Sequence, residues 1–262
     1  MSPLPQETLD SIIDHLHNEP TVLKTCCVVS KSWVPRTRKH LFTHVTFNTS
    51  NFRMAQWKKT FPDPSNSPAR YTRTLCVTNL KTLRAMDTDM GSWIHAFCNV
   101  VHLEFLYVCR AVLAQFCGLS PTVRSLRLTH STAEVFDLIC SFPLLEDLAL
   151  INLYSEGGAE VWKAPSTSPK LTGILELRSP VVTRPAVRRL LDLPGGLHFS
   201  GIDVMFFDDE AESVKELISG CSSTLEFLTT RCYPSCTFPL APVTDKYLTA
   251  IRRHRHTQDC SI

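Results

Sequence analysis

The chain has 262 residues, of which 44 % are hydrophobic and 20 % charged, and its formal net charge at neutral pH is +2. This length allows one or two domains with a sizeable core. The near balance of 27 basic and 25 acidic residues gives no electrostatic reason to expect nucleic acid or a membrane surface as the main partner. Only 9 glycines are present, which argues against folds that cradle phosphates in glycine-rich loops.

The beginning of the chain has neither the basic nor the apolar region of a signal peptide, and no run approaches 18 apolar residues. The 11 cysteines are scattered, and several, such as Cys76 and Cys140, stand in apolar surroundings. Buried free thiols of this kind are typical of a reducing compartment. We therefore expect no membrane segment and a cytoplasmic or nuclear protein.

Two apolar stripes at helical spacing predict two helices near the start of the chain. Pro5 suits the beginning of the first, Glu7 lies in its first turn, and residues 19–21 separate it from the second. The stripes comprise Leu9, Ile12, Ile13 and Leu16 in the first helix, and Val22, Leu23, Cys26 and Cys27 in the second.

A third helix is predicted with Trp33, Thr37 and Leu41 along one face, Ser30 or Ser32 as its cap, and Pro35 in its first turn. Val45 and Phe47 then alternate with polar residues, which predicts a strand. Residues 62–70 are rich in proline and serine and predict a loop or linker.

From about residue 70 one pattern recurs: an apolar residue, two others, an apolar residue, one other, and an apolar residue. Its middle positions fall at residues 75, 106, 126, 148, 175, 202 and 228. After the first, the separations lie within the roughly 20–29 residue period of leucine-rich repeats. Helix-like segments at 133–142, 186–193 and 210–218 stand between the strands. Such units bury their apolar faces only by stacking, so we expect an irregular solenoid of about seven strands.

The repeat pattern departs from tidy leucine-rich repeats at its turn position, where asparagine or cysteine is usual. Asn152 is the nearest approach to it. A generic α/β domain with coincidental spacing is the alternative interpretation.

The first 45 residues resemble an F-box of the mushroom-type fungal kind. The resemblance is carried by an opening Leu-Pro-x-Glu, apolar residues at helical spacing, a Val-Ser-Lys-x-Trp signature and a closing Leu-Phe pair. These residues are Leu4, Pro5 and Glu7; Leu9, Ile12, Ile13 and Leu16; Val29, Ser30, Lys31 and Trp33; and Leu41 and Phe42. The expected α/β organisation is an F-box at 1–45, a connecting strand and linker at 46–70, a leucine-rich-repeat-like domain at 71–250 and a basic tail at 251–262.

The resemblance implies a non-catalytic adaptor of an SCF-type cullin ubiquitin ligase, in which the box binds a Skp-type adaptor and the repeats bind a protein substrate. The expected adaptor-binding residues are Leu4, Pro5, Glu7, Leu9, Ile13, Val29 and Trp33, with Ile12, Leu16 and Leu23 expected in the core. Trp33 suits either role. The alternative is a repeat interaction module with no ubiquitin-ligase role, whose helices only cap the solenoid.

The sequence shows only weak matches to the motifs of catalytic, nucleotide-binding and metal-binding sites. No Gly-x-Ser-x-Gly is present, and Gly196 and Gly201 lack the Lys-Ser/Thr of a nucleotide-binding loop. A set of loosely spaced cysteines and histidines and a cluster of carboxylates are interpreted as ordinary surface rather than as metal sites. They are Cys232, Cys236, His254, His256 and Cys260, and Asp208, Asp209, Glu210 and Glu212. We expect no cofactor, and an unrecognised enzyme is a third hypothesis.

Solenoids of this kind bind along their strand face, so residues that alternate with buried strand positions are candidates for substrate contact. These are Tyr107, Arg127, Arg178, and Thr229 or Arg231. The basic run at 252–256 is interpreted as a solvated chain end, with nucleic-acid binding or nuclear import as the alternative.

Overall fold

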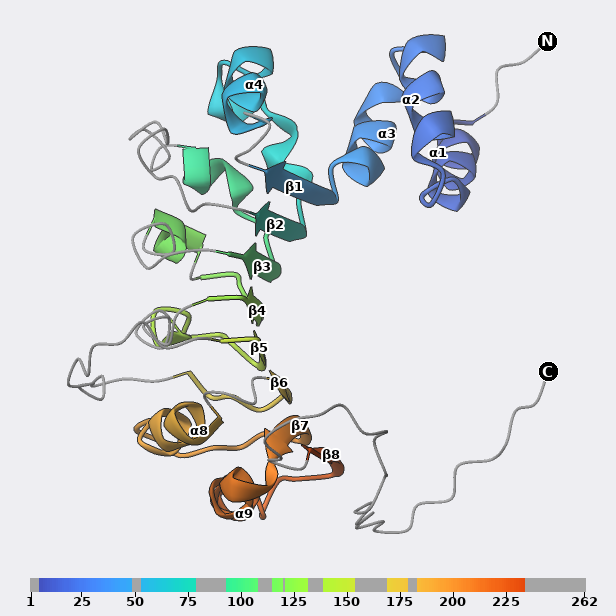
Figure 1. Cartoon of the computed structure of the whole chain (residues 1–262). Coiled ribbons are helices and arrows are strands. Elements are labelled where there is room, and N and C mark those ends of the chain that lie inside the picture. Colours follow the sequence, from blue (N-terminus) through green and yellow to red (C-terminus); the bar gives the residue numbers. More distant parts are fainter. Residues whose placement is uncertain are drawn as a thin grey trace, which may run out of the picture.

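The computed structural model describes residues 5–48, 53–78, 93–107, 115–119, 121–131, 139–153, 169–178 and 183–233. These ranges contain six α-helices and one open sheet of eight parallel strands, which confirms the α/β class. The first four helices in chain order stand near one end of the sheet, and the last two lie beside the sheet toward its other end (Figure 1). None of the described helices is both long and apolar enough to cross a bilayer.

The helical block comprises α1 (Gln6–His15), α2 (Pro20–Val29) and α3 (Val34–Leu41), as the apolar stripes predict. Prolines stand in the first turns of α2 and α3, where a missing N–H breaks no helical hydrogen bond. The predicted serine cap of α3 is wrong. Its N-cap residue is Trp33, while the Ser30 and Ser32 hydroxyl oxygens bond to each other at 2.9 Å.

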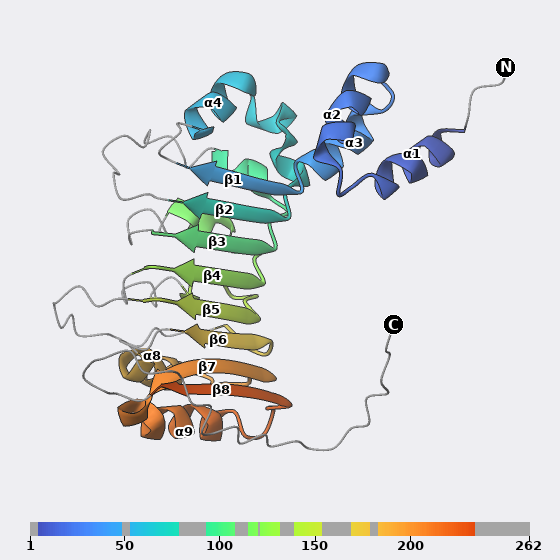
Figure 2. The same ribbon diagram turned by 45° about the vertical axis from the view of Figure 1, so that its right-hand side comes forward.

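The sheet is built from strands stacked in chain order, each parallel to the next (Figure 2). We refer to β1–β8 with the segments between them as the strand stack. The strands are β1 (His44–Asn48), β2 (Thr74–Thr78), β3 (His102–Leu106), β4 (Ser125–Thr129), β5 (Asp147–Ile151), β6 (Ile174–Arg178), β7 (Gly201–Phe207) and β8 (Phe227–Tyr233).

One row of inward apolar side chains crosses the whole strand stack: Val45, Leu75, Leu103, Leu126, Leu148, Leu175, Ile202 and Leu228. All but the last are buried, so β8 closes the core less completely than its neighbours. The sheet gains a strand over the seven expected, because the strand predicted at Val45 and Phe47 pairs with β2.

The predicted middle position of β3 is wrong by three residues. Leu103, not Leu106, aligns with Leu75 and Leu126, and Val100 and Phe105 complete the buried pattern. Leu106 is half-buried on the other face. The correction replaces separations of 31 and 20 residues by 28 and 23, which is closer to the spacing of the remaining strands.

The helices beside the sheet cover its inward face. Helix α8 (Thr183–Leu191) buries Ala186, Val187 and Leu190, and α9 (Ala211–Gly220) buries Val214 and Leu217. Both confirm predicted helical segments, whereas most of the segment predicted at 133–142 lies outside the described residues. Single turns η5 (His95–Phe97) and η6 (Phe116–Leu119) lie between other strands, and the single turn η8 (Asp208–Glu210) directly precedes α9. The opposite face of the sheet carries no described helix (Figure 1).

The segment predicted as a loop at 62–70 is instead folded into two short helical turns, η2 (Pro64–Asn66) and η3 (Pro68–Tyr71). The side chains of Asp63 and Ser67 accept hydrogen bonds from the backbone N–H groups two residues on, at 2.9 and 3.3 Å. Ala69 is fully buried. The same residue types that signal loops also cap helical turns, so composition alone gives the wrong state here.

Aromatic side chains join the helical block to the first strand. Phe42 follows α3, Phe47 is on β1, and Trp57 is on α4 (Arg53–Thr60). With Phe61 and Phe97 they form a cluster whose ring centroids lie 5.0–6.0 Å apart, mostly edge to face. This geometry is favourable for aromatic pairs and anchors the block to the strand stack.

Candidate protein-interaction surfaces

Most exposed apolar side chains among the described residues belong to two parts of the chain, the helical block and the strands β6 and β8. Seven large ones are exposed: Ile12, Val22, Val28, Val29, Leu144, Ile174 and Phe227. Four of them belong to α1 and α2, and two stand at the first positions of β6 and β8. Because apolar side chains in contact with water mark interaction sites when they cluster, each group is a candidate surface.

The helical block exposes much of its apolar content because it has little core of its own. Its buried side chains are Ile13, Leu23, Cys26 and Thr37. In contrast, Val28 is 83 % exposed and Val29 is 61 % exposed at the end of α2. A three-helix unit of this size buries only a modest fraction of its surface, which leaves apolar area in contact with water.

The predicted adaptor-binding residues divide between surface and core. Pro5, Glu7 and Val29 are exposed, Leu9 and Trp33 are half-buried, and Leu4 lies outside the described residues.

Two neighbouring predictions in α1 are wrong. Ile13, expected at the interface, is a core residue at 1 % exposure, whereas Ile12, expected in the core, is 48 % exposed. Adjacent helical residues point about 100° apart, so the stripe contained both and the packing of α2 and α3 decided between them. Leu23 is in the core as predicted.

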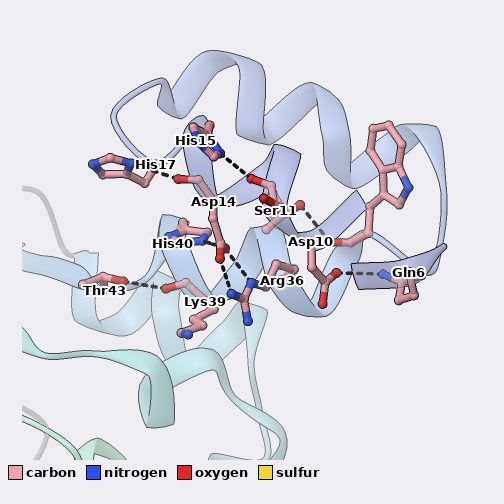
Figure 3. A network of polar contacts seen from close by, with 12 residues as sticks. Gln6, Asp10, Ser11, Asp14, His15, His17, Arg36, Lys39, His40 and Thr43 are labelled. Atoms are coloured by element: carbon pink, nitrogen blue, oxygen red, sulfur yellow. Dashed lines mark hydrogen bonds and ion pairs between the residues drawn. The ribbon is translucent and has the colours of Figure 1, made fainter. Parts of the chain in front are cut away.

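A polar network holds α1 against α3 (Figure 3). Arg36 donates both Nε and Nη2 to the carboxylate of Asp14, and Nε2 of His40 lies 2.7 Å from the same group. The hydrogen bonds from Arg36 and His40 hold the pKa of Asp14 well below its usual range. The bidentate geometry fixes how the two helices are oriented.

The open face of the sheet carries a ladder of alternating charges. Arg127 Nη2 lies 2.7 Å from Glu176 Oε2, two strands away, and Arg178 Nη2 lies 2.6 Å from Asp203 Oδ2. Arg178 Nε also lies 3.0 Å from Glu176 Oε1. The strand pairing confirms the outward position predicted for Arg127, Arg178, and Thr229 or Arg231, because each alternates with inward residues of its strand. Their contact with a substrate stays a prediction.

Tyr107 does not belong to this face. It follows the end of β3 with a positive φ of 58°, and its ring stacks on that of His130 at 4.5 Å between centroids and 2° between planes. The misplaced register of β3 explains the error, since the outward position there is Leu106. His130 and Asn152 have the same left-handed backbone directly after β4 and β5. Asn152 is therefore exposed, and Leu153 is buried beside it.

The charged side chains that alternate outward with the inward row are nearly balanced along the strand stack. On β3 and β4 they are Glu104 and Arg127, and on β5–β8 they are Asp147, Glu176 and Asp203 with Arg178 and Arg231. Four further charged residues stand two positions before an inward residue and therefore do not share the parity of the open face: Arg73, Arg124, Glu146 and Glu226.

Sequence reasoning missed three residues of β6–β8, which we call the Ile174–Phe227 patch: Ile174, Gly201 and Phe227. Gly201 lies between the other two in the sheet. A Cβ placed on it would lie 3.3 Å from Ile174 Cγ1 and 3.4 Å from Phe227 Cδ1, so both side chains lean over the glycine. The signal was present in the sequence, because an apolar residue directly before an inward strand leucine must face outward.

The cluster of carboxylates after β7 is structural. Glu210 is buried, its Oε1 accepts a hydrogen bond from Arg184 N at 3.1 Å, and its Oε2 lies 3.5 Å from Phe207 N. Glu212 is exposed and pairs with Lys215 at 2.9 Å. The buried carboxylate thus ties the first turn of α8 to the turn before α9, rather than facing solvent as expected.

The described part of the chain holds no group of three potential metal-ligating side chains, and Cys236, His254, His256 and Cys260 lie outside it. Its cysteines are free thiols. Burial, aided by Glu104, raises the pKa of Cys76 to about 11, and burial with the hydrogen bond to Asp208 raises the pKa of Cys232 to about 11. Thiols protonated at neutral pH are poor nucleophiles.

Comparison with known proteins leaves the interpretation to the geometry of this chain. No protein-family model matches it, and no curated protein or solved structure matches it either.

Proposed function

We propose that the chain is the substrate-recognition subunit of an SCF-type cullin ubiquitin ligase. In this role the helical block is an F-box that binds a Skp-type adaptor, and the strand stack is a leucine-rich-repeat solenoid that holds a protein substrate. The subunit supplies no chemical group. It raises the effective concentration of substrate lysines near the ubiquitin-charged enzyme.

The observation that carries the proposal is the apolar surface of the helical block. Val29 is the first residue of the Val-Ser-Lys-x-Trp signature of the F-box resemblance, and Val28 directly precedes it. They are the two most exposed large apolar side chains described. Ile12 on α1 and Val22 at the start of α2 are exposed as well. A covering partner would remove these groups from water at a gain of roughly 25 cal/mol per Å² of apolar area.

The architecture supports a two-ended adaptor. The block stands at the β1 end of the strand stack, so its surface and the β5–β8 half of the open face are separate (Figure 1). The aromatic cluster around Trp57 joins the two parts through packed rings. A firm connection is what positioning of a bound substrate requires.

The alternative role is a solenoid interaction module whose helices only cap its first strand. It is favoured by the packing of Phe42 against Trp57, with ring centroids 5.6 Å apart, because this contact covers the edge of the core.

Capture of a purified Skp-type adaptor separates the two roles. We expect the wild-type chain to bind it at micromolar concentration, and Val29→Asp to weaken binding by at least about tenfold, as for an anchor side chain in an interface. Arg231→Ala, on the last strand, is the matched control and should bind normally. Absence of wild-type binding at micromolar concentration would overturn the proposal in favour of the capping role.

A further inference from the structure

We infer that the chain forms a twofold-symmetric dimer in which strand β8 of one copy pairs antiparallel with β8 of a second copy. The contact is made by the free edge of the sheet, which is distinct from both the surface of the helical block and the open face. The inference goes beyond the proposed function and does not depend on it.

The two ends of the strand stack differ in how they are covered. At the β1 end, Trp57 of α4 packs on Phe42 and Phe47, with ring centroids 5.6 Å apart in both pairs. Within the part of the chain that the structure describes, β8 has a neighbouring strand on one side only. An uncovered edge strand of seven residues is a template for pairing with another strand, and the ends of a solenoid need a cover.

The backbone of β8 has hydrogen-bonding groups ready for such a strand. Phe227 N donates to Ser200 O at 3.0 Å, so the backbone groups of Phe227 and of every second residue after it point toward β7. The residues between them are Leu228, Thr230 and Cys232. Their N–H and C=O groups point away from β7, along the free edge, where a further strand would bond to them.

The core is also incompletely covered at this edge. Leu228 and Cys232 are half-buried, whereas Ile202 and Phe206, their partners on β7, are buried. Each inner strand of the stack is covered by a strand on both sides, and β8 lacks the second one among the described residues. A strand added to β8 would remove these apolar groups from water, at a gain of roughly 25 cal/mol per Å².

Helix α9 presents a further apolar side chain at the same end, beyond α8 (Figure 1). Gly220 faces α8, because a Cβ placed on it would lie 3.0 Å from Leu191 Cδ2. Positions 218 and 220 are about 200° apart around a helix. Half-buried Ile218 therefore lies on the flank of α9 that faces away from α8, toward the β8 end.

The sequence of β8 is complementary to itself, which identifies the second strand as another copy of the chain. When two copies run antiparallel about Thr230, Phe227 lies opposite Tyr233 of the second copy. Leu228 lies opposite Cys232, and the two Thr230 residues meet at the centre. Aromatic, apolar and β-branched pairs of this kind stabilise antiparallel sheets. An isologous contact needs this symmetry, and a strand from a different protein would not.

The pairing also keeps inward residues with inward residues. Leu228, Thr230 and Cys232 share the inward parity and are the residues with free backbone groups, so they form the hydrogen-bonded pairs. Phe227 and Tyr233 share the outward parity. Phe227 contacts Gly201 on one side and is still 56 % exposed, which leaves surface for the aromatic pair.

Arg231 selects the register. A register centred on Arg231 would put like charges directly opposite each other, which is unfavourable. A register centred on Thr229 would leave Cys232 and Tyr233 beyond the start of the other strand. In the register centred on Thr230, Arg231 lies opposite Thr229, and the two arginines are diagonal neighbours about 7–8 Å apart. Their repulsion weakens the dimer without preventing it.

Sedimentation velocity of the full-length protein at about 1–200 µM tests the inference. We expect a monomer–dimer equilibrium with a dissociation constant of about 1–50 µM, since seven residues a side make a small interface. No larger species should form, because an isologous contact closes on itself. A chain that stays monomeric over this range, or one that forms larger assemblies, overturns the inference. The first result is also expected if residues 234–262 or another protein occupy the edge.

Variants locate the contact. Thr230→Lys puts two like charges opposite each other at the centre and should weaken the dimer at least about tenfold. An inward-pointing charge is also how natural sheets protect an edge. Thr129→Lys, on the central strand β4, is the control for added charge and should leave the dimer unchanged. Arg231→Thr removes the diagonal repulsion and should tighten the dimer about threefold. Weakening by Arg231→Thr contradicts the register.

A cross-link reads the register directly and does not depend on a disruptive variant. Only a register centred on residue 230 brings that position next to itself, with a Cα–Cα distance of about 5.5 Å that suits a disulfide. Mild oxidation of Thr230→Cys should therefore give a dimer linked at position 230, identified by peptide mass spectrometry. Thr129→Cys should give no link at position 129. A dimer without a link at position 230 overturns the inference.

The test is separate from that of the proposed function. Thr230→Lys lies on the last strand and leaves the helical block untouched, so capture of the Skp-type adaptor should be normal. Failure of the dimer leaves the proposed function standing, and loss of adaptor capture leaves the dimer standing.

Discussion

The helical block and the strand stack differ in how completely they bury their apolar side chains. In the strand stack each inward residue is covered by the strand on either side and by a return segment, so apolar side chains from Val45 to Val204 are almost completely buried. The helical block has only three helices to pack against one another, and it leaves Val28 and Val29 in water. The difference teaches that stacked repeats bury nearly all of their inward apolar side chains, while a block of three short helices leaves apolar surface in water.

The largest loss of stability is expected from a cavity in the core of the strand stack. Phe105 is fully buried and packs edge to face on Phe116 at 5.1 Å. Phe105→Ala should lower the free energy of unfolding by about 3–5 kcal/mol, through lost burial and a cavity. Urea unfolding followed by circular dichroism measures it. Leu106→Ala, one position away on the open face, should cost under about 1 kcal/mol. A larger loss from Leu106→Ala would contradict the corrected register.

A smaller effect is expected in the helical block. Ile13→Ala removes a side chain from a core with few members and should cost about 2–5 kcal/mol of the stability of the block. Hydrogen exchange should show lost protection in α1–α3 with the strand stack unchanged. Ile12→Ala is the matched control, expected under about 1 kcal/mol because its side chain is exposed. Equal losses of stability from Ile13→Ala and Ile12→Ala would mean that α1 is rotated about its axis, so that both side chains are buried to the same extent.

The buried carboxylate between α8 and α9 tests whether polar contacts contribute to the strand stack. Glu210→Ala leaves the N–H of Arg184 without its acceptor, and a loss of about 1–3 kcal/mol follows. Thermal unfolding measures it. Glu212→Ala, exposed and two residues away, should stay within about 0.5 kcal/mol. If both variants behave alike, the bonds of Glu210 carry no stability.

The smallest effect is the pH dependence of the helical block. The pKa of Asp14 is lowered in the folded state by Arg36 and His40, so the folded state favours its charged form. Its contribution is present above the unfolded pKa of about 4 and is lost as pH falls below that value. As the pH falls below about 4, we expect the amide protons of the helical block to lose protection from hydrogen exchange. This pH-dependent loss should be smaller in Asp14→Asn. A block that keeps the same pH dependence in Asp14→Asn would exclude this cause.

The sequence was sufficient for elements that repeat. Inward leucines at a regular separation predicted most strands of the sheet, and alternation placed Arg127 and Arg178 on the open face. The error at β3 arose because Leu103 and Leu106 both fit the apolar pattern. Only even spacing favours Leu103, and that is a property of neighbouring strands rather than of the strand itself.

Other features depended on contacts that sequence does not give. Adjacent Ile12 and Ile13 are equivalent in an apolar stripe, and the neighbouring helices decide which is buried. The pairing of Arg127 with Glu176, 49 positions later, needs the register of two strand pairs. Residues 62–70 carried loop composition, and the caps that convert it to helical turns are seen only when Asp63 and Ser67 meet the backbone.

Because the register is unbroken from β1 to β8, the number of strands sets the length of the sheet. Each added strand advances the molecule by about 4.8 Å, so the five intervals from β1 to β6 set roughly 24 Å between the start of the stack and the Ile174–Phe227 patch. Deleting or duplicating one whole repeat unit would change that length by the spacing of one strand, while the two ends of the strand stack stay intact. The separation of the two surfaces is thus counted in strands and can be altered in discrete steps.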